Sequence, residues 1–224
     1  IAVLCETEHK YDPAWAALHG VDLDALVLLQ PPHLEAATEQ FEAIIDRAEG
    51  RRVLIAHDSV AATPCRKEVE EGMSGTPGIG EAARVWSRSL RILSAKMSKH
   101  QVALVLVNQV RTKIGVMYGN PETTPSGNAI KHYASLRLSV NHGKSIDGGT
   151  GRYVNVTMLK NQVCPPFRKA QLRLDFDKGF NDRWEVLNHA KEMGRVPAKC
   201  QSLKEAAKAL GWDDMLTKDD GRPW

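Results

Sequence analysis

Polar side chains that could bind a phosphate or a metal ion follow three apolar, strand-like runs of the sequence. Glu6 and Glu8 come after residues 1–5, Asp58 and Ser59 after residues 52–56, and Asn108 and Gln109 after residues 102–107. In open α/β sheets, ligands bind at the carboxyl ends of the strands. An aspartate directly after an apolar strand commonly holds Mg²⁺ in nucleotide-hydrolysing proteins. Each group alone could be a cap or a surface side chain, but three in register predict one ligand-binding edge.

The elements that must carry these side chains alternate along the chain. Apolar runs at residues 1–5, 25–29, 52–56 and 102–107 are separated by amphipathic stretches, and residues 34–48 carry an apolar stripe at helical spacing. This alternation predicts an α/β fold around a largely parallel sheet. After residue 130 the rhythm changes to strand-like segments with few helical signals between them, at residues 133–140, 152–159 and 168–175. We therefore expect an antiparallel extension of the sheet.

Composition indicates one core with a small addition. The chain has 224 residues, of which 42% are hydrophobic and 25% charged, values typical of globular proteins. We expect a core domain over residues 1–180 and a small α-rich subdomain over residues 181–224. The longest apolar runs are strand-sized, which excludes a transmembrane helix. The four cysteines are far apart and form no CxxC pair, which argues against a zinc site or a disulfide framework and favours the cytoplasm.

One region of the chain is basic and free of acids. Residues 82–121 contain no Asp or Glu, whereas 27 acids in 224 residues would place about five there. At about 100° per residue, a helix in the first part of this region brings Arg84, Arg88 and Arg91 within about 60° of one another. Its apolar residues lie on the opposite side. The arginine face is either a solvated surface or a binding face for a polyanion.

Two loops lie at the ends of this region: residues 71–80 precede it, and residues 110–128 overlap its end. Both are rich in Gly, Pro, Ser and Thr, and the second is long for a compact domain. The second loop combines the cations Arg111 and Lys113 with apolar residues, including Ile114, that have no evident core to join. Cations and an apolar wedge on one loop suit a nucleic-acid backbone whose bases are spread apart.

These residues carry a family resemblance. Residues 108–135, NQVRTKIGVMYGNPETTPSGNAIKHYAS, resemble the second DNA-binding loop of bacterial and phage RecA recombinases, together with its flanks. Supporting matches at residues 6–15, 57–64, 80–91 and 158–167 follow in the order of the family and cover most of residues 1–180. The resemblance implies a RecA-like P-loop NTPase core, with a mostly parallel twisted sheet flanked by helices, an antiparallel extension and a small C-terminal subdomain.

The resemblance also implies a site for ATP and Mg²⁺. Glu8 matches the glutamate that activates the attacking water, and Gln109 the glutamine that links the γ-phosphate to the DNA loop. Lys160 matches a lysine that reaches the nucleotide of the neighbouring subunit, as an arginine finger does. Among the nucleotide-binding positions, Asp58 matches the metal-binding Walker B aspartate and Ser59 its neighbour, while Asp12 and Trp15 match the residues that bind adenine.

The resemblance also implies a set of DNA-binding residues. Ile79 and Ile114 match the apolar side chains that wedge between base triplets. The set that contacts the DNA backbone is matched by Arg84, Ser87, Arg91, Arg111, Lys113, Ser126, Gly127 and Asn128.

One departure from the family concerns the phosphate loop. The chain contains no GxxxxGK[ST] motif. Its only Gly-Lys-Ser run, Gly143-Lys144-Ser145, has Leu138 where the first glycine must be and follows the wrong strand. The family's phosphate loop lies just before the strand with which this chain begins, so we expect a truncation. This chain alone is expected to hydrolyse little or no ATP.

Three further departures are single residues. Gln162 stands where the family has a second trans-acting lysine, and His132 replaces an aromatic residue of the subunit interface. His57 precedes Asp58 where an apolar residue is usual; we interpret it as a histidine packed beside the sheet rather than a catalytic group.

The leading hypothesis is an ATP-dependent homologous-recombination and DNA-repair protein of the DNA-damage (SOS) response. It would form helical homo-oligomeric filaments on single-stranded DNA and exchange strands with double-stranded DNA, without a membrane. Two alternatives stay open. One is a ring-forming, helicase-like ATPase of the same superfamily, and the other is a non-catalytic DNA-binding module without a phosphate loop.

Overall fold

The computed structural model describes residues 1–75, 78, 80–112 and 122–210. The chain divides into two compact units, which are described separately. One unit holds Ile1–Ala17 and Val21–Ala134, and the other holds Leu18–Gly20 and the residues from Ser135 onward. The predicted boundary after residue 180 stays a prediction.

The first unit is built on a parallel four-stranded sheet, as predicted. Its strands are β1 (Ala2–Glu6), β2 (Leu26–Leu29), β3 (Val53–Asp58) and β4 (Val102–Leu106), in the order β2-β1-β3-β4. All four lie within the predicted apolar runs or within two residues of them. The register pairs Glu6 at the end of β1 with Asp58 at the end of β3. The carboxyl ends of the two central strands therefore meet at one edge.

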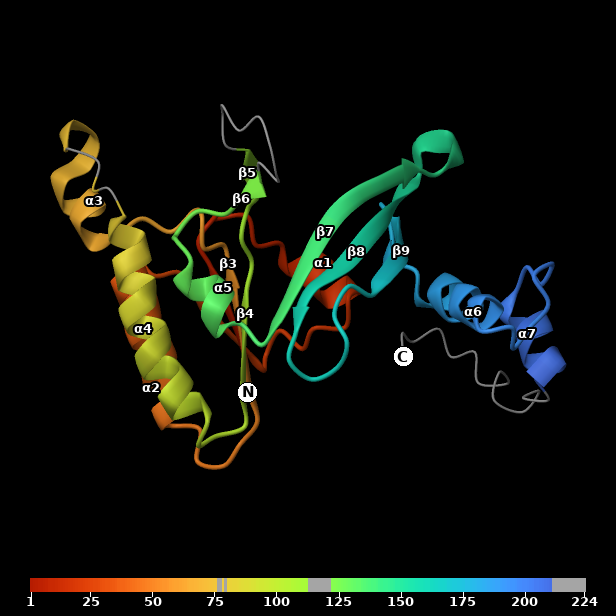
Figure 1. Ribbon diagram of the computed structural model, residues 1–224, viewed down its shortest axis with the longest axis horizontal. Coiled ribbons are helices and arrows are strands. Elements are labelled where there is room, and N and C mark those ends of the chain that lie inside the picture. Colours follow the sequence, from red (N-terminus) through yellow and green to blue (C-terminus); the bar gives the residue numbers. More distant parts are fainter. Residues whose placement is uncertain (76–77, 79, 113–121, 211–224) are drawn as a thin grey trace. The chain divides into compact units, whose positions relative to one another are not determined.

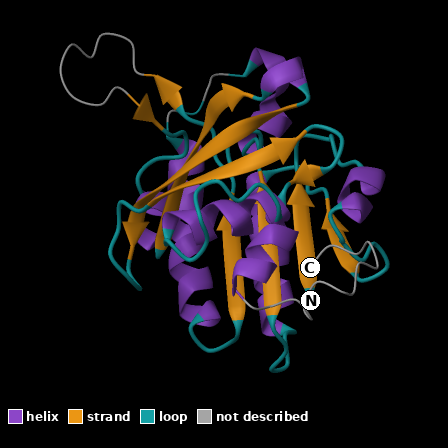
Figure 2. Cartoon of the chain, turned by 90° about the vertical axis from the view of Figure 1, so that its right-hand side faces the viewer, coloured by secondary structure: helices purple, strands orange, loops and turns teal. Residues whose placement is uncertain are grey.

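Helices α2 (Leu34–Asp46) and α4 (Glu81–Met97) lie side by side, and their apolar residues join those of the sheet in one core (Figure 1). Phe41 of α2 and Trp86 of α4 are fully buried there. Trp86, Leu90 and Leu93 recur at the three- and four-residue spacing of a helix face, which is why this side of α4 is buried. Figure 2 shows helices lying against the parallel strands.

The starts of both helices follow from local chemistry. The ring nitrogen Nδ1 of His33 accepts a hydrogen bond of 3.1 Å from the backbone amide of Ala36, so His33 caps α2. Gly80 precedes α4 with φ of 71°, a left-handed conformation that glycine adopts without steric cost. The remaining elements of this unit are short: α1 (Pro13–Leu18), α3 (Arg66–Glu71), the 3₁₀ turn η1 (Gly72–Ser74), β5 (Arg111–Thr112), β6 (Glu122–Thr123) and α5 (Ala129–Tyr133).

The second unit contains the predicted antiparallel strands. β7 (Leu136–Ser145), β8 (Gly151–Asn161), β9 (Lys169–Asp175) and β10 (Gly179–Phe180) pair in the order β10-β9-β8-β7, with the turn η2 (Asp147–Gly149) between β7 and β8. The antiparallel direction is confirmed, and the strands pair with one another as a second sheet. Helices α6 (Asp182–Glu192) and α7 (Leu203–Leu210) follow them.

The Gly143-Lys144-Ser145 run lies inside β7, not in a phosphate-binding loop. A Cβ atom at Gly143 would lie 2.8 Å from the backbone oxygen of Tyr153 on β8, so the glycine allows the two strands to approach closely. The pairing of β7 with β8 shifts register between His142 and Ser145, so the run lies at an irregularity of a strand pair and does not precede an α-helix as a phosphate-binding loop does. No helix in the described part of the chain has both the length and the apolar character needed to cross a membrane.

Candidate functional site

The strand-end side chains of the first unit meet at a hydrogen-bonded cluster. The hydroxyl of Ser59, just after β3, donates a bond of 2.9 Å to Oε1 of Glu8, just after β1. Lys10 approaches the other carboxylate oxygen of Glu8 at 3.0 Å. The side chain of Gln109, beyond β4, also hydrogen-bonds Glu8. Three chain segments distant in sequence therefore converge on one carboxylate.

These contacts keep Glu8 ionised. The hydrogen bond from Lys10 has the largest effect on its pKa, followed by the bond from Ser59, and the Gln109 bond adds to both. All three lower the pKa of Glu8 because they stabilise the carboxylate form. An ionised carboxylate accepts hydrogen bonds only, so it can orient a water molecule by accepting its proton.

Glu6 has a different task from Glu8, two residues later. Its side chain is buried, and one oxygen accepts bonds from the backbone amides of Glu8 at 2.8 Å and Lys10 at 3.0 Å. The other oxygen accepts a 3.2 Å bond from the side chain of Gln30. Burial alone would raise the pKa of Glu6, but these bonds outweigh burial and lower it. Glu6 thus holds the turn that presents Glu8, a role that strand-end position alone did not distinguish.

The pKa of Asp58 is raised, in contrast to the lowered pKa values of Glu6 and Glu8. Burial is the largest cause of its raised pKa, and the negative charges of Glu8 and Glu6 raise it further, while Lys10 opposes them. A cation beside Asp58 would relieve this repulsion, so the residues present fit Mg²⁺. The described residues contain no group of three or more His, Cys, Asp or Glu side chains arranged for a metal. Mg²⁺ is usually bound through one or two carboxylates with waters and phosphates.

His57 is packed in the core, as the sequence indicated. Its ring is fully buried and lies edge-on to Phe41 at 5.6 Å and to Trp86 at 5.7 Å between centroids. Burial lowers the pKa of His57, and a hydrogen bond to the backbone of Ser59 opposes this shift. The histidine is therefore neutral near pH 7.

Asp12 caps α1. Its Oδ1 accepts bonds from the backbone amides of Ala14 at 2.8 Å and Trp15 at 3.1 Å. The indole of Trp15 is 41% exposed. The adenine-binding role that the resemblance implies for Asp12 and Trp15 stays a prediction.

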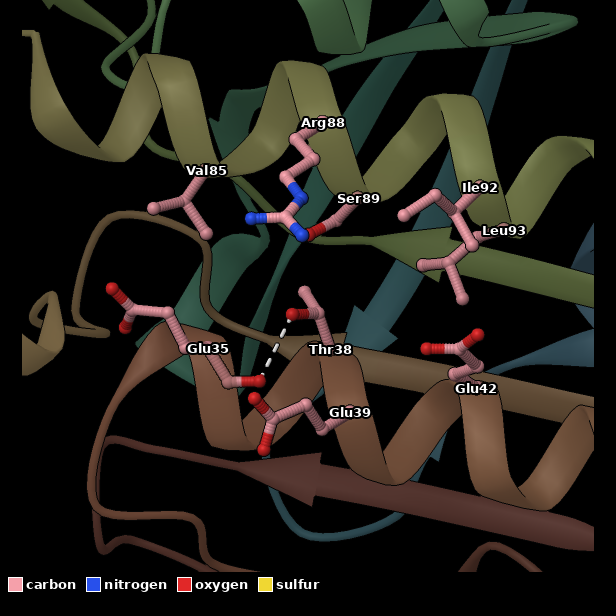
Figure 3. A pocket seen from close by; sticks show the side chains of 9 residues that line it. All are labelled: Glu35, Thr38, Glu39, Glu42, Val85, Arg88, Ser89, Ile92 and Leu93. Carbon is pink, nitrogen blue, oxygen red and sulfur yellow. Dashed lines mark hydrogen bonds between the residues drawn. The ribbon is translucent and has the colours of Figure 1, made fainter.

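The outward face of α4 is narrower than the sequence indicated. Arg84, Ser87 and Arg91 are exposed, opposite the buried Trp86, as predicted. Arg88 is exposed as well, but its side chain extends toward α2 and lines a groove of about 360 Å³ (Figure 3). Helical spacing groups Arg88 with Arg84 and Arg91, and only the presence of α2 beside α4 shows in which direction its side chain extends.

The groove between α2 and α4 is acidic on its α2 side, and its carboxylates already have partners. Glu35 accepts a bond of 2.8 Å from the backbone amide of Arg66, and Glu39 lies 3.5 Å from the Arg66 guanidinium. Glu42 lies 2.8 Å from Lys96. This surface is held by internal ion pairs.

The described flanks of the second loop lie at the start of α4. Arg111 and Ser126 line a cavity of about 410 Å³ with residues 60–64 and Ala82. Gly127 has φ of 76° and packs so closely that a Cβ there would lie 2.7 Å from the Cβ of Ala83. Asn128 directly precedes α5. The predicted DNA-binding residues Ile79, Lys113 and Ile114 lie outside the described residues.

Lys160 lies on β8 in the second unit, where it is paired in register with Arg137 of β7. Its predicted role at a neighbouring subunit stays a prediction. Gln162, which stands at the other trans-acting position of the resemblance, donates its backbone amide to the Ser135 carbonyl at 3.1 Å.

Comparison with known proteins decides the family. The model of the RecA N-terminal domain matches residues 1–181, which is most of the chain. The chain belongs to the RecA family. The protein named RecA in Gloeobacter violaceus is 39% identical over 214 residues, covering 94% of this chain and 57% of that protein. The RecA of Herpetosiphon aurantiacus is 41% identical over 191 residues, covering 84% of this chain and 52% of that protein. This RecA-family chain therefore spans about half the length of these curated relatives.

A solved structure supports the RecA-like fold. The crystal structure of the RadB recombinase aligns with a TM-score of 0.55, covering 80% of this chain and 77% of that one, at 16% sequence identity. At this identity the likeness establishes the fold alone. The parallel sheet with flanking helices agrees with the fold expected from the RecA resemblance.

Proposed function

We propose that this chain is part of an ATP-dependent homologous-recombination protein that forms filaments on single-stranded DNA and exchanges strands with a duplex. The observation that carries the proposal is the convergence on Glu8. Its carboxylate is bonded to Ser59, beside Asp58, and to Gln109, where the segment that resembles a DNA-binding loop begins. One residue thus connects the nucleotide-binding edge with the predicted DNA-binding segment.

In the proposed hydrolysis of ATP, Glu8 orients the attacking water and accepts its proton. Lys10 and Ser59 hold this carboxylate in place and ionised. Asp58 would hold Mg²⁺, which would supply positive charge against the negative charge of the phosphates. Gln109 links the γ-phosphate to the loop that follows it. Lys160 of a neighbouring subunit stabilises the charge on the transferred group.

In the proposed DNA complex, Arg84, Ser87 and Arg91 of α4 contact the phosphate backbone. Arg111, Ser126, Gly127 and Asn128 line the base of the second loop, and Lys113 belongs to the loop itself. Ile79 and Ile114 separate the bases. Because the contacts are to phosphates and stacked bases, binding should tolerate any sequence and weaken with salt.

Two further features complete the proposal. The nucleotide lies between subunits, and head-to-tail contacts of this type produce open helical filaments. The protein works in the cytoplasm, in the response to DNA damage.

Electron microscopy of the full-length gene product with ATP and single-stranded DNA tests the proposal. Open helical filaments, together with strand exchange between a labelled single strand and a homologous duplex, are expected. Closed hexamers that unwind DNA would support a ring-forming ATPase instead. DNA binding without any ATP hydrolysis would support a non-catalytic module.

A further inference from the structure

The buried histidine beside the nucleotide-binding edge has a defined hydrogen-bonding state. The hydroxyl of Thr63 donates to the backbone carbonyl of Ser59 at 2.9 Å, and a carbonyl oxygen can only accept. The same hydroxyl oxygen lies 2.9 Å from Nε2 of His57. With its own proton used, Thr63 must accept from His57. His57 therefore carries a proton on Nε2, and burial, which lowers its pKa, favours the neutral ring.

This hydrogen bond begins a short chain that ends at Glu8. Thr63 Oγ1 lies 3.0 Å from the hydroxyl of Thr7, which sits between Glu6 and Glu8 in the turn after β1. Ser59, whose carbonyl accepts from Thr63, donates its own hydroxyl to Glu8 at 2.9 Å. The side chains of His57, Ser59 and Thr63 are all buried. Little water competes for these bonds, so a displacement at one end is transmitted rather than absorbed by solvent.

The other end of the chain touches α4. The His57 ring is held between Phe41 of α2 and Trp86 of α4, edge-on to both. Trp86 is fully buried and lies on the side of α4 opposite Arg84 and Arg91. Trp86 and the two arginines lie on one continuous helix, so the indole that contacts the histidine ring and the outward arginines belong to the same rigid element.

Two buried polar atoms at this contact have no partner within the described residues. They are Nδ1 of His57 and the indole Nε1 of Trp86. Buried polar groups are normally hydrogen-bonded. The contact therefore costs stability that an aliphatic side chain at position 57 would not cost, which argues that the histidine serves more than packing.

We propose that His57 is a positioning residue that couples α4 to the catalytic carboxylate Glu8 through Thr63 and Ser59. The proposal rests on the proposed function, since it assigns a role to the DNA-facing helix and to Glu8. DNA on the outer face of α4 shifts Trp86, the His57 ring follows, and the Thr63–Ser59 bonds re-aim the Glu8 carboxylate. An aliphatic residue would fill the same space but could not donate to Thr63.

The test compares variants of the full-length gene product by the factor with which single-stranded DNA raises ATP turnover. His57→Leu keeps the volume and removes the donor, whereas His57→Gln keeps an amide donor near the position of Nε2. Thr63→Val removes the acceptor in an isosteric side chain. Coupling between sites commonly corresponds to factors of about 5 to 150. We expect His57→Leu and Thr63→Val to lower the stimulation about fivefold or more, and His57→Gln to retain most of it.

A matched control separates coupling from general damage to the core. Thr38→Val makes the same change at another buried threonine, on α2, whose hydroxyl donates to the backbone carbonyl of Glu35 at 3.0 Å. It should lower the melting temperature by an amount similar to Thr63→Val and leave the stimulation factor unchanged. The double variant His57→Leu/Thr63→Val should lose no more coupling than either single variant, because both remove one bond.

The outcomes are distinguishable. If the wild-type protein shows no DNA-stimulated ATP hydrolysis, the proposed function fails. If the wild type is stimulated and both His57→Leu and Thr63→Val keep its full factor, the coupling role of His57 is overturned. Nitrogen-15 NMR of the histidines in this chain gives an independent check, since a proton on Nδ1 of His57 would contradict the bond to Thr63.

Discussion

Glu6 and Glu8 are two residues apart, but Glu6 is buried, whereas Glu8 is partly exposed and is the proposed catalytic residue. Glu6 is buried and accepts bonds from two backbone amides and from Gln30, so it acts as a fixed internal acceptor. Glu8 accepts hydrogen bonds from the side chains of Lys10, Ser59 and Gln109, which come from three different segments. The first residue shapes the turn, and the second is available for chemistry.

Replacement of Glu8 by glutamine should abolish most ATP hydrolysis and leave DNA binding intact. Glutamine keeps the shape but cannot accept a proton, and a positioned general base commonly contributes a factor of about 10² to 10⁴. Turnover by the full-length Glu8→Gln protein should fall at least about 100-fold, measured by phosphate release with single-stranded DNA present. Glu70→Gln, an exposed change on α3, is the control and should have wild-type turnover. Wild-type turnover in Glu8→Gln would remove Glu8 from the mechanism.

Replacement of Glu6 by glutamine should destabilise the fold in a pH-dependent way. Its pKa is lowered in the folded state, so its contribution is present above the unfolded pKa of about 4.3 and is lost as the pH falls through the folded value. Glu6→Gln should lower the free energy of unfolding by about 1–3 kcal/mol at neutral pH. Urea unfolding of this chain should show a smaller difference from wild type below about pH 4. A difference that stays constant down to acid pH would mean that the charge of Glu6 does not contribute.

At the scale of elements, α4 has three sides with three partners. Trp86, Leu90 and Leu93 face the core, Arg88 faces the groove beside α2, and Arg84, Ser87 and Arg91 face outward. The helix therefore presents a short basic row, not a broad basic surface. Arg88 therefore differs from Arg84 and Arg91 in its surroundings, although all three are arginines of the same helix.

Two proposed phosphate-contacting arginines, Arg91 on the outward face of α4 and Arg111 at the start of the second loop, should determine much of the salt dependence of DNA binding. Each phosphate contact on a single strand contributes about 0.7 to the slope of log affinity against log salt concentration. Arg91→Ala/Arg111→Ala should therefore lower the slope by about 1.4, measured by fluorescence anisotropy with labelled single-stranded DNA. Arg88→Ala is the matched control because its side chain lines the groove, and its slope should equal that of wild type. Equal slopes for all three proteins would remove this face from the DNA interface.

At the scale of the whole molecule, the proposed catalytic groups are divided between the two compact units. Glu8, Asp58 and Gln109 belong to the first, whereas Lys160 belongs to the second. If Lys160 acts on a neighbouring subunit, each complete site needs two chains. Catalysis would then depend on assembly.

Mixing two inactive variants should restore activity. In a head-to-tail filament of equal parts Glu8→Gln and Lys160→Ala, about a quarter of the interfaces join an intact Glu8 to an intact Lys160. ATP turnover of the mixture should reach about a quarter of the wild-type value, although each variant alone is nearly inactive. Lys169→Ala, on the neighbouring strand β9, is the control and should be active by itself. No recovery on mixing would mean that both residues act within one chain.

Much of the fold was predictable because it depends on local periodicity. The four parallel strands, the antiparallel direction of the later strands and the buried side of α4 follow from which residues repeat at two or at three to four positions. The burial of His57 was predicted because its position lies in an apolar strand. The strand-end groups were also found from sequence, since the end of an apolar run marks the end of a strand.

Only the tertiary structure decided what each of these groups touches. Glu6 and Glu8 have the same sequence signal, and the fold alone made one a buried acceptor and the other the meeting point of Ser59 and Gln109. Arg88 extends to α2 because that helix packs beside α4, and the His57 ring contacts Phe41 and Trp86 because both helices pack on the sheet. Periodicity determines on which face of its own helix or strand a side chain lies. The residue that it contacts on the next element comes from a distant part of the chain. That pairing depends on packing of the whole core, which no local pattern encodes.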